Sequence, residues 1–300
     1  MNSKLCPACD GNRLTQAFQK NNEVEIIKMH ASGFSRGNRN LFRCDTCELI
    51  FCDPMPAFDI LEENYAIDSD PEFVSQNSSR ILTFKKHLKW LEQEMKLDKQ
   101  SDQILDIGSA GGAFLEAARQ LNISAVGLEI NPWLVNWGIS NYKINLKVGN
   151  IEGILASTVK YKVISLWDVL EHLPNPQASL KIITSKIEKK GYLILSLPNT
   201  DSVSFKLMRW SWPMHLDVHL LYFNSISIEK LLEKYNYQLV SKKTNRQTLS
   251  FGYILTRVLK QLKMINPNKK VTELLLNGWP SKLKITYSIG QTIFLFQDKK

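Results

Sequence analysis

From residue 102 onward the chain alternates short apolar runs with segments of helix length, and this alternation constrains the fold more than any other feature. Amphipathic segments near residues 112–121, 132–141 and 177–188 separate the runs. Strands that alternate with helices favour a doubly wound, mostly parallel α/β sheet with helices on both faces. The last run, residues 290–300, is expected to be an antiparallel strand. The other expected strands are Gln103–Ile107, Ala125–Glu129, Asn145–Gly149, Val163–Trp167 and Tyr192–Leu197.

The segment "ILDIGSAGGAF", residues 104–114, follows the first of these strands and is rich in small residues. Ligands of parallel sheets bind at the carboxyl ends of the strands, where helix N-termini offer unpaired N–H groups. A dinucleotide fingerprint needs a third glycine where Ala113 stands, and a phosphate loop needs a lysine that is absent here. The small residues therefore indicate that a ligand approaches the backbone closely. They match neither the dinucleotide pattern nor the phosphate-loop pattern.

What fits is an acidic-x-G-x-G-x-G pattern, with Asp106, Gly108, Ala110 and Gly112 in its four places. On this pattern the chain resembles the class I S-adenosylmethionine-dependent methyltransferases, and Ala110 is a small departure at the middle glycine. The resemblance covers roughly residues 80–300. It implies a seven-stranded Rossmann-like sheet and S-adenosylmethionine as the cofactor.

Further residues match this family in chain order. The resemblance implies that Glu129 accepts hydrogen bonds from the ribose hydroxyls, although a nicotinamide nucleotide would also suit that carboxylate. It places Asn150 and Ile151 at the adenine, where the family more often has an aspartate than an asparagine. The segment "ISLWDVLEHLPNP", residues 164–176, would flank the methionine end. The cofactor-binding set is Asp106, Gly108, Ser109, Ala110, Gly112, Glu129, Ile130, Asn150, Ile151, Trp167 and Asp168.

Four of the five cysteines form two CxxC pairs, Cys6 with Cys9 and Cys44 with Cys47. Two such turns supply four thiolates to one tetrahedral ion, and zinc is the expected metal, although iron suits the same ligands. The closed site predicts a structural role, because it leaves no position for a substrate. Nucleic-acid or substrate binding by this module is the alternative. We expect Cys52 to be a small buried residue rather than a ligand.

Three regions follow from these features: a zinc-binding module over residues 1–60, a helical connector covering the cofactor site over 61–101, and the methyltransferase domain over 102–300. Insertions at about 200–225 and 250–285 are expected to build the acceptor pocket. No apolar run is long enough to span a membrane and no leader precedes the cysteines, so we expect a cytoplasmic, soluble chain. The oligomeric state is not predicted.

The excess of positive over negative charge lies entirely in the last third of the chain. Residues 201–300 hold 16 Lys and Arg against 6 Asp and Glu, whereas residues 1–200 hold 22 against 23. The tryptophan-rich segment 205–214 is a candidate acceptor lid, a surface that stacks on sugar or aromatic rings, or a membrane-interface segment. In the expected helix 253–265 we assign Ile254, Leu255, Val258, Leu259 and Leu262 to one side and Arg257, Lys260 and Lys263 to the other. The apolar side is expected to pack on the core; peripheral membrane contact is the alternative.

Histidines are the candidate general bases, because an oxygen nucleophile must lose a proton near neutral pH. We rank His219 first, followed by His215 and His172, and a purely structural role is the alternative for each. If the segment "WPMHLDVHLLYF" were helical, His215 and His219 would share a face like a metal-binding pair. No carboxylate at helical spacing completes that set, since Asp217 would point elsewhere.

The sequence thus predicts a methyltransferase acting on a hydroxyl of a small-molecule or glycan acceptor: a sugar, nucleotide-sugar, quinone or secondary metabolite, with lipid-linked acceptors included. An RNA or protein methyltransferase that uses the zinc module and the basic region is the first alternative. It is disfavoured because the N-P-P-Y type motif is missing after the fourth strand. A cofactor-binding scaffold without catalysis is the second alternative.

Overall fold

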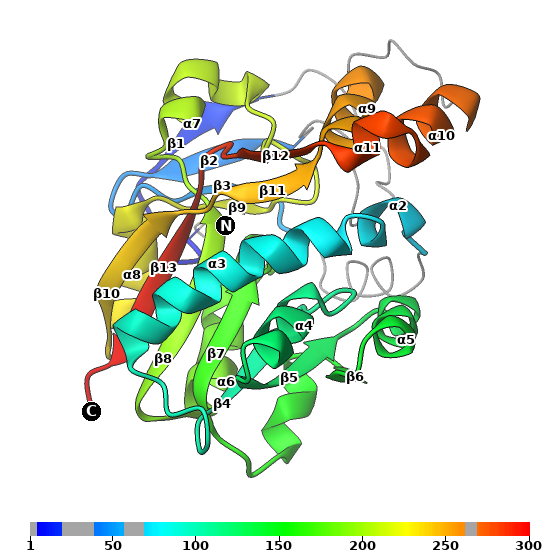
Figure 1. The fold of residues 1–300 in the computed structure, drawn as a ribbon. Helices are drawn as coiled ribbons and strands as arrows, with labels where there is room; N and C mark the ends of the chain where they lie inside the picture. The colour runs from blue at the N-terminus through cyan, green and yellow to red at the C-terminus, as the bar shows by residue number, and fades with distance from the viewer. Residues whose placement is uncertain (1–4, 20–38, 57–68, 262–268) are drawn as a thin grey trace.

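The computed structural model describes residues 5–19, 39–56, 69–261 and 269–300 (Figure 1). Its strands are β1 (Leu14–Phe18), β2 (Leu41–Cys44), β3 (Ile50–Cys52), β4 (Gln103–Ile107), β5 (Ser124–Glu129), β6 (Asn145–Val148), β7 (Tyr161–Trp167), β8 (Ile187–Pro198), β9 (Leu221–Tyr222), β10 (Tyr237–Thr244), β11 (Gln247–Ser250), β12 (Lys284–Tyr287) and β13 (Gln291–Asp298). Its α-helices are α2 (Pro71–Val74), α3 (Asn77–Met95), α4 (Ala113–Gln120), α5 (Pro132–Asn141), α6 (Pro176–Ser185), α7 (Val203–Met208), α8 (Ser225–Glu233), α9 (Phe251–Gln261), α10 (Lys269–Asn277) and α11 (Trp279–Lys282). Short 3₁₀ turns lie at η1 (Glu152–Ala156), η2 (Leu170–His172) and η3 (Arg209–Ser211).

The central sheet has seven strands in the order β10-β13-β8-β7-β4-β5-β6. Strands β4 to β8 pair in parallel, whereas β13 runs antiparallel to both β8 and β10. The predicted fold class and the antiparallel last strand are therefore confirmed. The five strands expected between residues 103 and 197 are all present, and β8 is longer than expected at both ends.

Asparagines and prolines fix where the helices of this sheet begin. The Asn131 side chain accepts hydrogen bonds from the N–H groups of Trp133 and Leu134 at the start of α5. Proline follows this asparagine and also follows Asn175, the N-cap of α6. Proline is well suited to a first helical position because the N–H it lacks would have no partner there. The chain therefore turns sharply from strand to helix at the carboxyl edge of the sheet.

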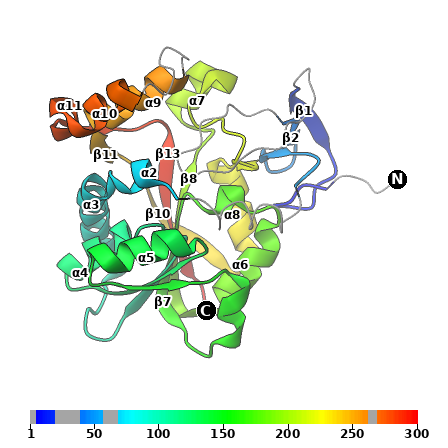
Figure 2. The same ribbon diagram turned by 90° about the vertical axis from the view of Figure 1, so that its right-hand side faces the viewer.

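Two hydrophobic cores lie on opposite faces of the sheet. On one face α3 and α4 pack together against the strands, as Figure 1 shows for the long helix that crosses in front of the sheet. On the other face α6 and α8 contribute Leu180, Ile183 and Leu231, and the buried cysteines join the same core. The N-terminal region lies on this second side, away from α3 and α5 (Figure 2).

The N-terminal strands form a second sheet, in the order β1-β2-β3-β9. Its fourth strand comes from the C-terminal half of the chain: Ile50 pairs with Tyr222 and Phe51 pairs with Leu221. The Cys52 N–H also donates to the Leu220 carbonyl at 2.9 Å. The N-terminal region and the segment after His219 therefore share one sheet, while the division at residues 60 and 101 stays a prediction.

Two expectations about the C-terminal half meet different outcomes. Residues 215–219 form turns rather than a helix, so His215 and His219 do not share a helical face. Helix α9 covers the expected helix as far as Gln261, while Leu262 and Lys263 lie outside the described residues. No helix in the described ranges combines the length and apolar character needed to cross a membrane.

Candidate functional site

The small-residue loop after β4 adopts the backbone conformation that its sequence favours. Gly108 and Gly112 have φ values of 73° and 72°, in the left-handed region that side chains disfavour. Ala110 also has a positive φ of 45°, so the departure from the glycine pattern is accommodated with local strain rather than a different turn. The N–H groups of Gly108 and Ser109 donate to the Leu128 carbonyl, which ties the loop to β5.

Glu129 ends β5 and holds the loop from the other side. Its carboxylate accepts hydrogen bonds from the N–H of Ala110 at 2.8 Å and from the N–H of Asn131 at 2.9 Å. The side chain is almost fully buried, and burial raises its pKa. Each carboxylate oxygen retains a lone pair after these two bonds. Glu129 can therefore accept further hydrogen bonds from a ligand hydroxyl.

Two other carboxyl groups lie at the carboxyl edge of the sheet. Asp106 accepts a hydrogen bond from the Ser165 hydroxyl at 2.6 Å, and burial raises its pKa to about 7. Asp168 accepts from Ser196 at 3.0 Å and from Gln291 at 2.6 Å, and burial raises its pKa to about 6. Both groups are tied to neighbouring strands, so they define the shape of the site as well as its charge.

One cavity of about 570 Å³ opens over this edge of the sheet. Its size is that of a site for a small molecule. Every residue of the predicted cofactor set except Gly112 lines it. Gly112 instead lies at the N-cap of α4, where the left-handed backbone turns the chain into the helix.

Two helices outside the β-sheet also line the cavity. Asn77 of α3 donates to the Gly111 carbonyl at 2.8 Å, so α3 lies against the glycine-rich loop. Helix α3 contributes Asn77, Arg80 and Phe84, and helix α9 contributes Ile254, Arg257 and Val258. Placing Arg257 on the side of α9 opposite the apolar residues was wrong, because residues three and four positions apart share a helix face. On α3 the spacing of Asn77, Arg80 and Phe84 could have predicted this contribution. It places two polar side chains on the same helix face as an apolar one, as expected for a helix that lines a binding site.

The three candidate histidines occupy different surroundings. His172 and His219 line the cavity, whereas His215 does not and packs against Phe18, Trp210 and Tyr222. The rings of His172 and His219 meet edge to face, with their centroids 4.9 Å apart. Burial lowers the pKa of His172 to about 4 and lowers that of His219 well below its usual range.

Hydrogen bonds to carbonyl groups fix the three rings. Nδ1 of His172 donates to the Val218 carbonyl at 2.8 Å, and Nδ1 of His219 donates to the Met214 carbonyl at 2.8 Å. His215 makes the equivalent bond to Trp210 at 3.0 Å. A neutral imidazole whose Nδ1 carries the proton has its lone pair on Nε2.

Glu171 is the residue of this site that the sequence analysis missed. Its side chain has no exposed surface, and neither carboxylate oxygen has a hydrogen-bond partner among the described residues. Burial is the main cause that raises its pKa well above the ordinary range. A carboxylate oxygen of Glu171 lies within 4.8 Å of ring nitrogens of His172 and His219. An acidic residue inside the apolar stretch "VLEHL" was the available signal.

The four paired cysteines meet at one point of the N-terminal sheet. Their sulfur atoms all lie within 4.8 Å of one another, and the Cys6–Cys47 and Cys9–Cys44 Sγ distances are both 3.5 Å. These distances are too long for disulfides. They approach the ~3.8 Å separation that Zn–S bonds of about 2.3 Å give in a tetrahedron. The cluster therefore fits one tetrahedral zinc or iron ion, and Cys52 is outside it.

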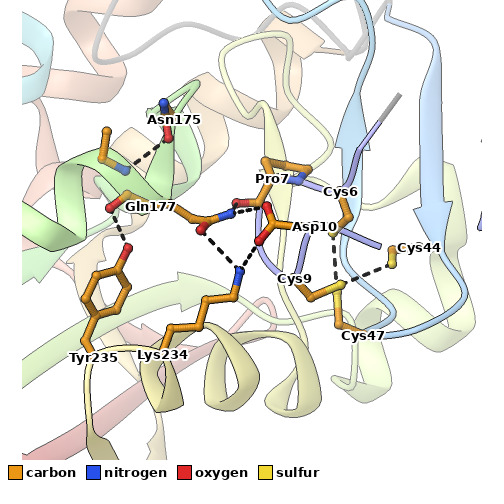
Figure 3. A network of polar contacts seen from close by, with 11 residues as sticks. Cys6, Pro7, Cys9, Asp10, Cys44, Cys47, Asn175, Gln177, Lys234 and Tyr235 are labelled. Atoms are coloured by element: carbon orange, nitrogen blue, oxygen red, sulfur yellow. Dashed lines mark hydrogen bonds and ion pairs between the residues drawn. The ribbon is translucent and has the colours of Figure 1, made fainter. Parts of the chain in front are cut away.

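A polar network joins this cluster to the central domain (Figure 3). Lys234, just after α8, donates to Asp10 at 2.7 Å and to the Gln177 side chain at 3.1 Å. Gln177, on α6, donates to Asp10 at 2.8 Å and to the Pro7 carbonyl at 3.1 Å. The first cysteine turn is thus anchored to two helices of the central domain.

Comparisons with known proteins agree on the fold. A family model described as a methyltransferase domain matches residues 78–242. The ubiquinone biosynthesis O-methyltransferase of Xanthomonas oryzae pv. oryzae is 26% identical over 118 residues, which cover 37% of this chain and 49% of that protein. The protein of the same name from Coxiella burnetii is 26% identical over 117 residues, with the same coverage. The chain spans about half the length of the curated relatives it matches.

Two solved structures resemble most of the chain. Magnesium protoporphyrin IX methyltransferase from Synechocystis, determined with bound S-adenosylhomocysteine, has a TM-score of 0.50 and 13% identity over 81% of this chain and 94% of its own. An S-adenosylmethionine-dependent methyltransferase from Archaeoglobus fulgidus has a TM-score of 0.50 and 16% identity over 76% of this chain and 100% of its own. At these identities the likeness shows the fold.

Proposed function

Because the chain belongs to the methyltransferase domain family, we propose that it transfers a methyl group from S-adenosylmethionine to a hydroxyl of a small-molecule acceptor. The observation that carries this proposal is the composition of one cavity. The glycine-rich loop and Glu129 line one part of it, and two histidines line another. A cofactor and an acceptor can therefore meet in a single enclosed space.

The cofactor residues fit S-adenosylmethionine in the arrangement the resemblance implies. We assign the Glu129 carboxylate to the ribose hydroxyls, since its two backbone donors leave lone pairs available. Asn150 and Ile151 are assigned to the adenine, and Trp167 and Asp168 to the methionine end. When bound, the cofactor supplies an electrophilic methyl group on a sulfonium. The loop from Gly108 to Gly111 positions it by close backbone contact.

The acceptor hydroxyl must lose its proton as the new bond forms. We assign that task to the two histidines that line the cavity, with His219 before His172. Their Nδ1 atoms donate to carbonyl groups, so each neutral ring has its lone pair on Nε2. His215 becomes a supporting residue, because it packs among aromatic rings outside the cavity wall.

The composition of the rest of the cavity lining supports a small acceptor with an apolar body and a negative group. Met214, Leu216 and Ile254 offer apolar surface, while Arg80 and Arg257 offer two cations. The curated relatives are named O-methyltransferases of ubiquinone biosynthesis, which supports an oxygen atom as the methyl acceptor. Phenols, quinols and sugar acids are the first classes to assay. Zinc at the four cysteines is assigned a structural role.

Calorimetric titration with S-adenosylhomocysteine tests the cofactor assignment. We expect micromolar binding by the wild type and a loss of about 10- to 100-fold in Glu129→Ala, since each hydrogen bond to a charged group contributes ~1.5–3 kcal/mol. Glu152→Ala, at an exposed residue of η1, is the matched control. A folded protein that binds neither the cofactor nor its product would contradict catalysis and favour a scaffold. Labelled methyl transfer to the acceptor classes then identifies the substrate.

A further inference from the structure

Glu171 is in an environment that a lone carboxylate does not tolerate. It has no exposed surface, and both of its oxygens are without hydrogen-bond partners in the described part of the chain. An ionised carboxylate in that position costs several kcal/mol unless a cation compensates it. Asp168 acts on it electrostatically and adds a second negative group nearby. Among the residues that the structure describes, no cation compensates the Glu171 carboxylate.

Two imidazole rings stand next to this carboxylate. Ring nitrogens of His172 and His219 and an oxygen of Glu171 lie within 4.8 Å of one another. Each Nδ1 donates to a backbone carbonyl, those of Val218 and Met214, at 2.8 Å. Such bonds fix the tautomer and the orientation of metal-binding histidines. Two imidazoles and one carboxylate are a ligand set that divalent transition metals accept.

The backbone around the three residues is rigidly tied. Glu171 and His172 form η2, and the Leu220 N–H donates to the Glu171 carbonyl at 2.9 Å. The Leu220 carbonyl in turn accepts from Cys52, and β9 follows directly in the N-terminal sheet. The two segments that carry the three side chains therefore hold a fixed separation, which a metal site requires.

We propose that Glu171, His172 and His219 bind one divalent metal ion at the wall of the cavity, separate from the four-cysteine site. His172 and His219 line the cavity and Glu171 does not, so the open coordination positions face the acceptor. The role that follows rests on the proposed function. A bound ion would hold the acceptor hydroxyl and lower its pKa, and the hydroxyl proton would pass to solvent water. In that metal-bound form His172 and His219 would be ligands, and the general-base role assigned above would apply only without the ion.

Manganese is the probe that separates the two sites, because thiolates select softer metals than Mn²⁺ whereas the Glu171 site offers a carboxylate, which suits Mn²⁺. Zinc-loaded wild-type protein is titrated with Mn²⁺, and bound ion is counted by electron paramagnetic resonance. Glu171→Gln, His219→Gln and the control Glu188→Gln, at an exposed residue of β8 far along the strand from the cavity, are treated alike. S-adenosylhomocysteine binding and circular dichroism are recorded for each protein.

We expect one Mn²⁺ per chain in the wild type and in Glu188→Gln, and binding at least about tenfold weaker in both site variants. No bound Mn²⁺ at millimolar concentration in the wild type overturns the site. Equal Mn²⁺ affinity of the wild type and His219→Gln also overturns the site. This second variant decides the question if Glu171→Gln does not fold. If the wild type binds Mn²⁺ but does not bind S-adenosylhomocysteine, the proposed function is contradicted and the metal site is retained.

Discussion

The cofactor side and the acceptor side of the cavity are built in different ways. The cofactor side comes mainly from one short stretch of chain, because β4, its loop, α4 and the end of β5 all lie between residues 103 and 129. The assigned residues Asn150, Ile151, Trp167 and Asp168 follow at the ends of the next two strands. The acceptor side brings together η2, the turns at 213–219 and helix α9. The pairing of β9 with β3 follows directly after these turns. Local backbone geometry defines the first, whereas long-range strand pairing defines the second. The two sides should therefore respond to different substitutions.

Loss of the four-cysteine site is expected to have the largest effect. Cys47→Ala should remove the bound zinc and lower the unfolding midpoint by on the order of 10 °C. Because β3 pairs with β9, methyl transfer should also be lost. S-adenosylhomocysteine affinity should change by no more than about twofold, since none of the four cysteines lines the cavity. Metal analysis, thermal unfolding and calorimetry measure the three effects.

Cys52→Ala is the matched control for that substitution. Its thiol is also buried, but it donates to the Met55 sulfur at 3.4 Å and is not part of the cluster. We expect full zinc content and a loss of stability of about 1 kcal/mol. If Cys47→Ala also loses most of its affinity for S-adenosylhomocysteine, the cofactor side and the acceptor side are not independent, because both would then depend on the cysteine site.

Gly108→Ala is expected to have an intermediate effect, confined to the cofactor side. A Cβ atom there would lie 2.5 Å from Cγ2 of Val169, and the φ of 73° adds strain of ~1–2 kcal/mol. S-adenosylhomocysteine affinity should fall by about tenfold or more, since 1.4 kcal/mol corresponds to a factor of ten. Zinc content should stay unchanged. Calorimetry and metal analysis of the same sample check both statements.

Ala110→Gly is the control for the loop. The backbone at Ala110 already has a φ of 45°, so glycine removes strain while adding freedom to the unfolded chain. These contributions oppose each other, and we expect stability and affinity to remain within about 0.5 kcal/mol of the wild type. Loss of zinc from Gly108→Ala would argue against two separately built sides.

Lys234→Ala is expected to have the smallest effect. The Asp10 side chain is 60% exposed in this ion pair, so solvent screening limits its contribution to roughly 0.5 kcal/mol or less. Lys234 is the first cause that lowers the pKa of Asp10 below 3.8. The contribution is therefore present above about pH 4 and is lost as the pH falls through the lowered value. Chemical unfolding at pH 7 and pH 3 measures the difference.

Lys189→Ala, at an exposed residue of β8, is the control for general charge removal. It should match the wild type at both pH values. If Lys234→Ala instead costs several kcal/mol, the polar network of Figure 3 would be a principal connection between the cysteine turn and the central domain. The pairing of β3 with β9 would then contribute less than this network to the connection between the two regions.

Sequence patterns anticipated the parts of the molecule that depend on near neighbours. The alternation of strands and helices, the glycine-rich turn and the CxxC pairs each depend on residues close in the chain, and the structure has all three. The set of cavity-lining cofactor residues was found in the same way, although their binding roles stay predictions. The place of His215 outside the cavity was not predicted, because its surroundings include Phe18, nearly two hundred residues away in the chain.

The composition of the acceptor wall depended on the tertiary fold. Glu171 and His219 are separated by 48 positions in the chain, and only the turns before β9 bring them within reach of one another. Neither periodicity nor spacing records a contact of that range, because a chain loop of such length has many closures of similar entropy. Short-range backbone geometry therefore determines most of the cofactor side. The pairing of β9 with β3, residues far apart in the chain, determines which side chains face the acceptor.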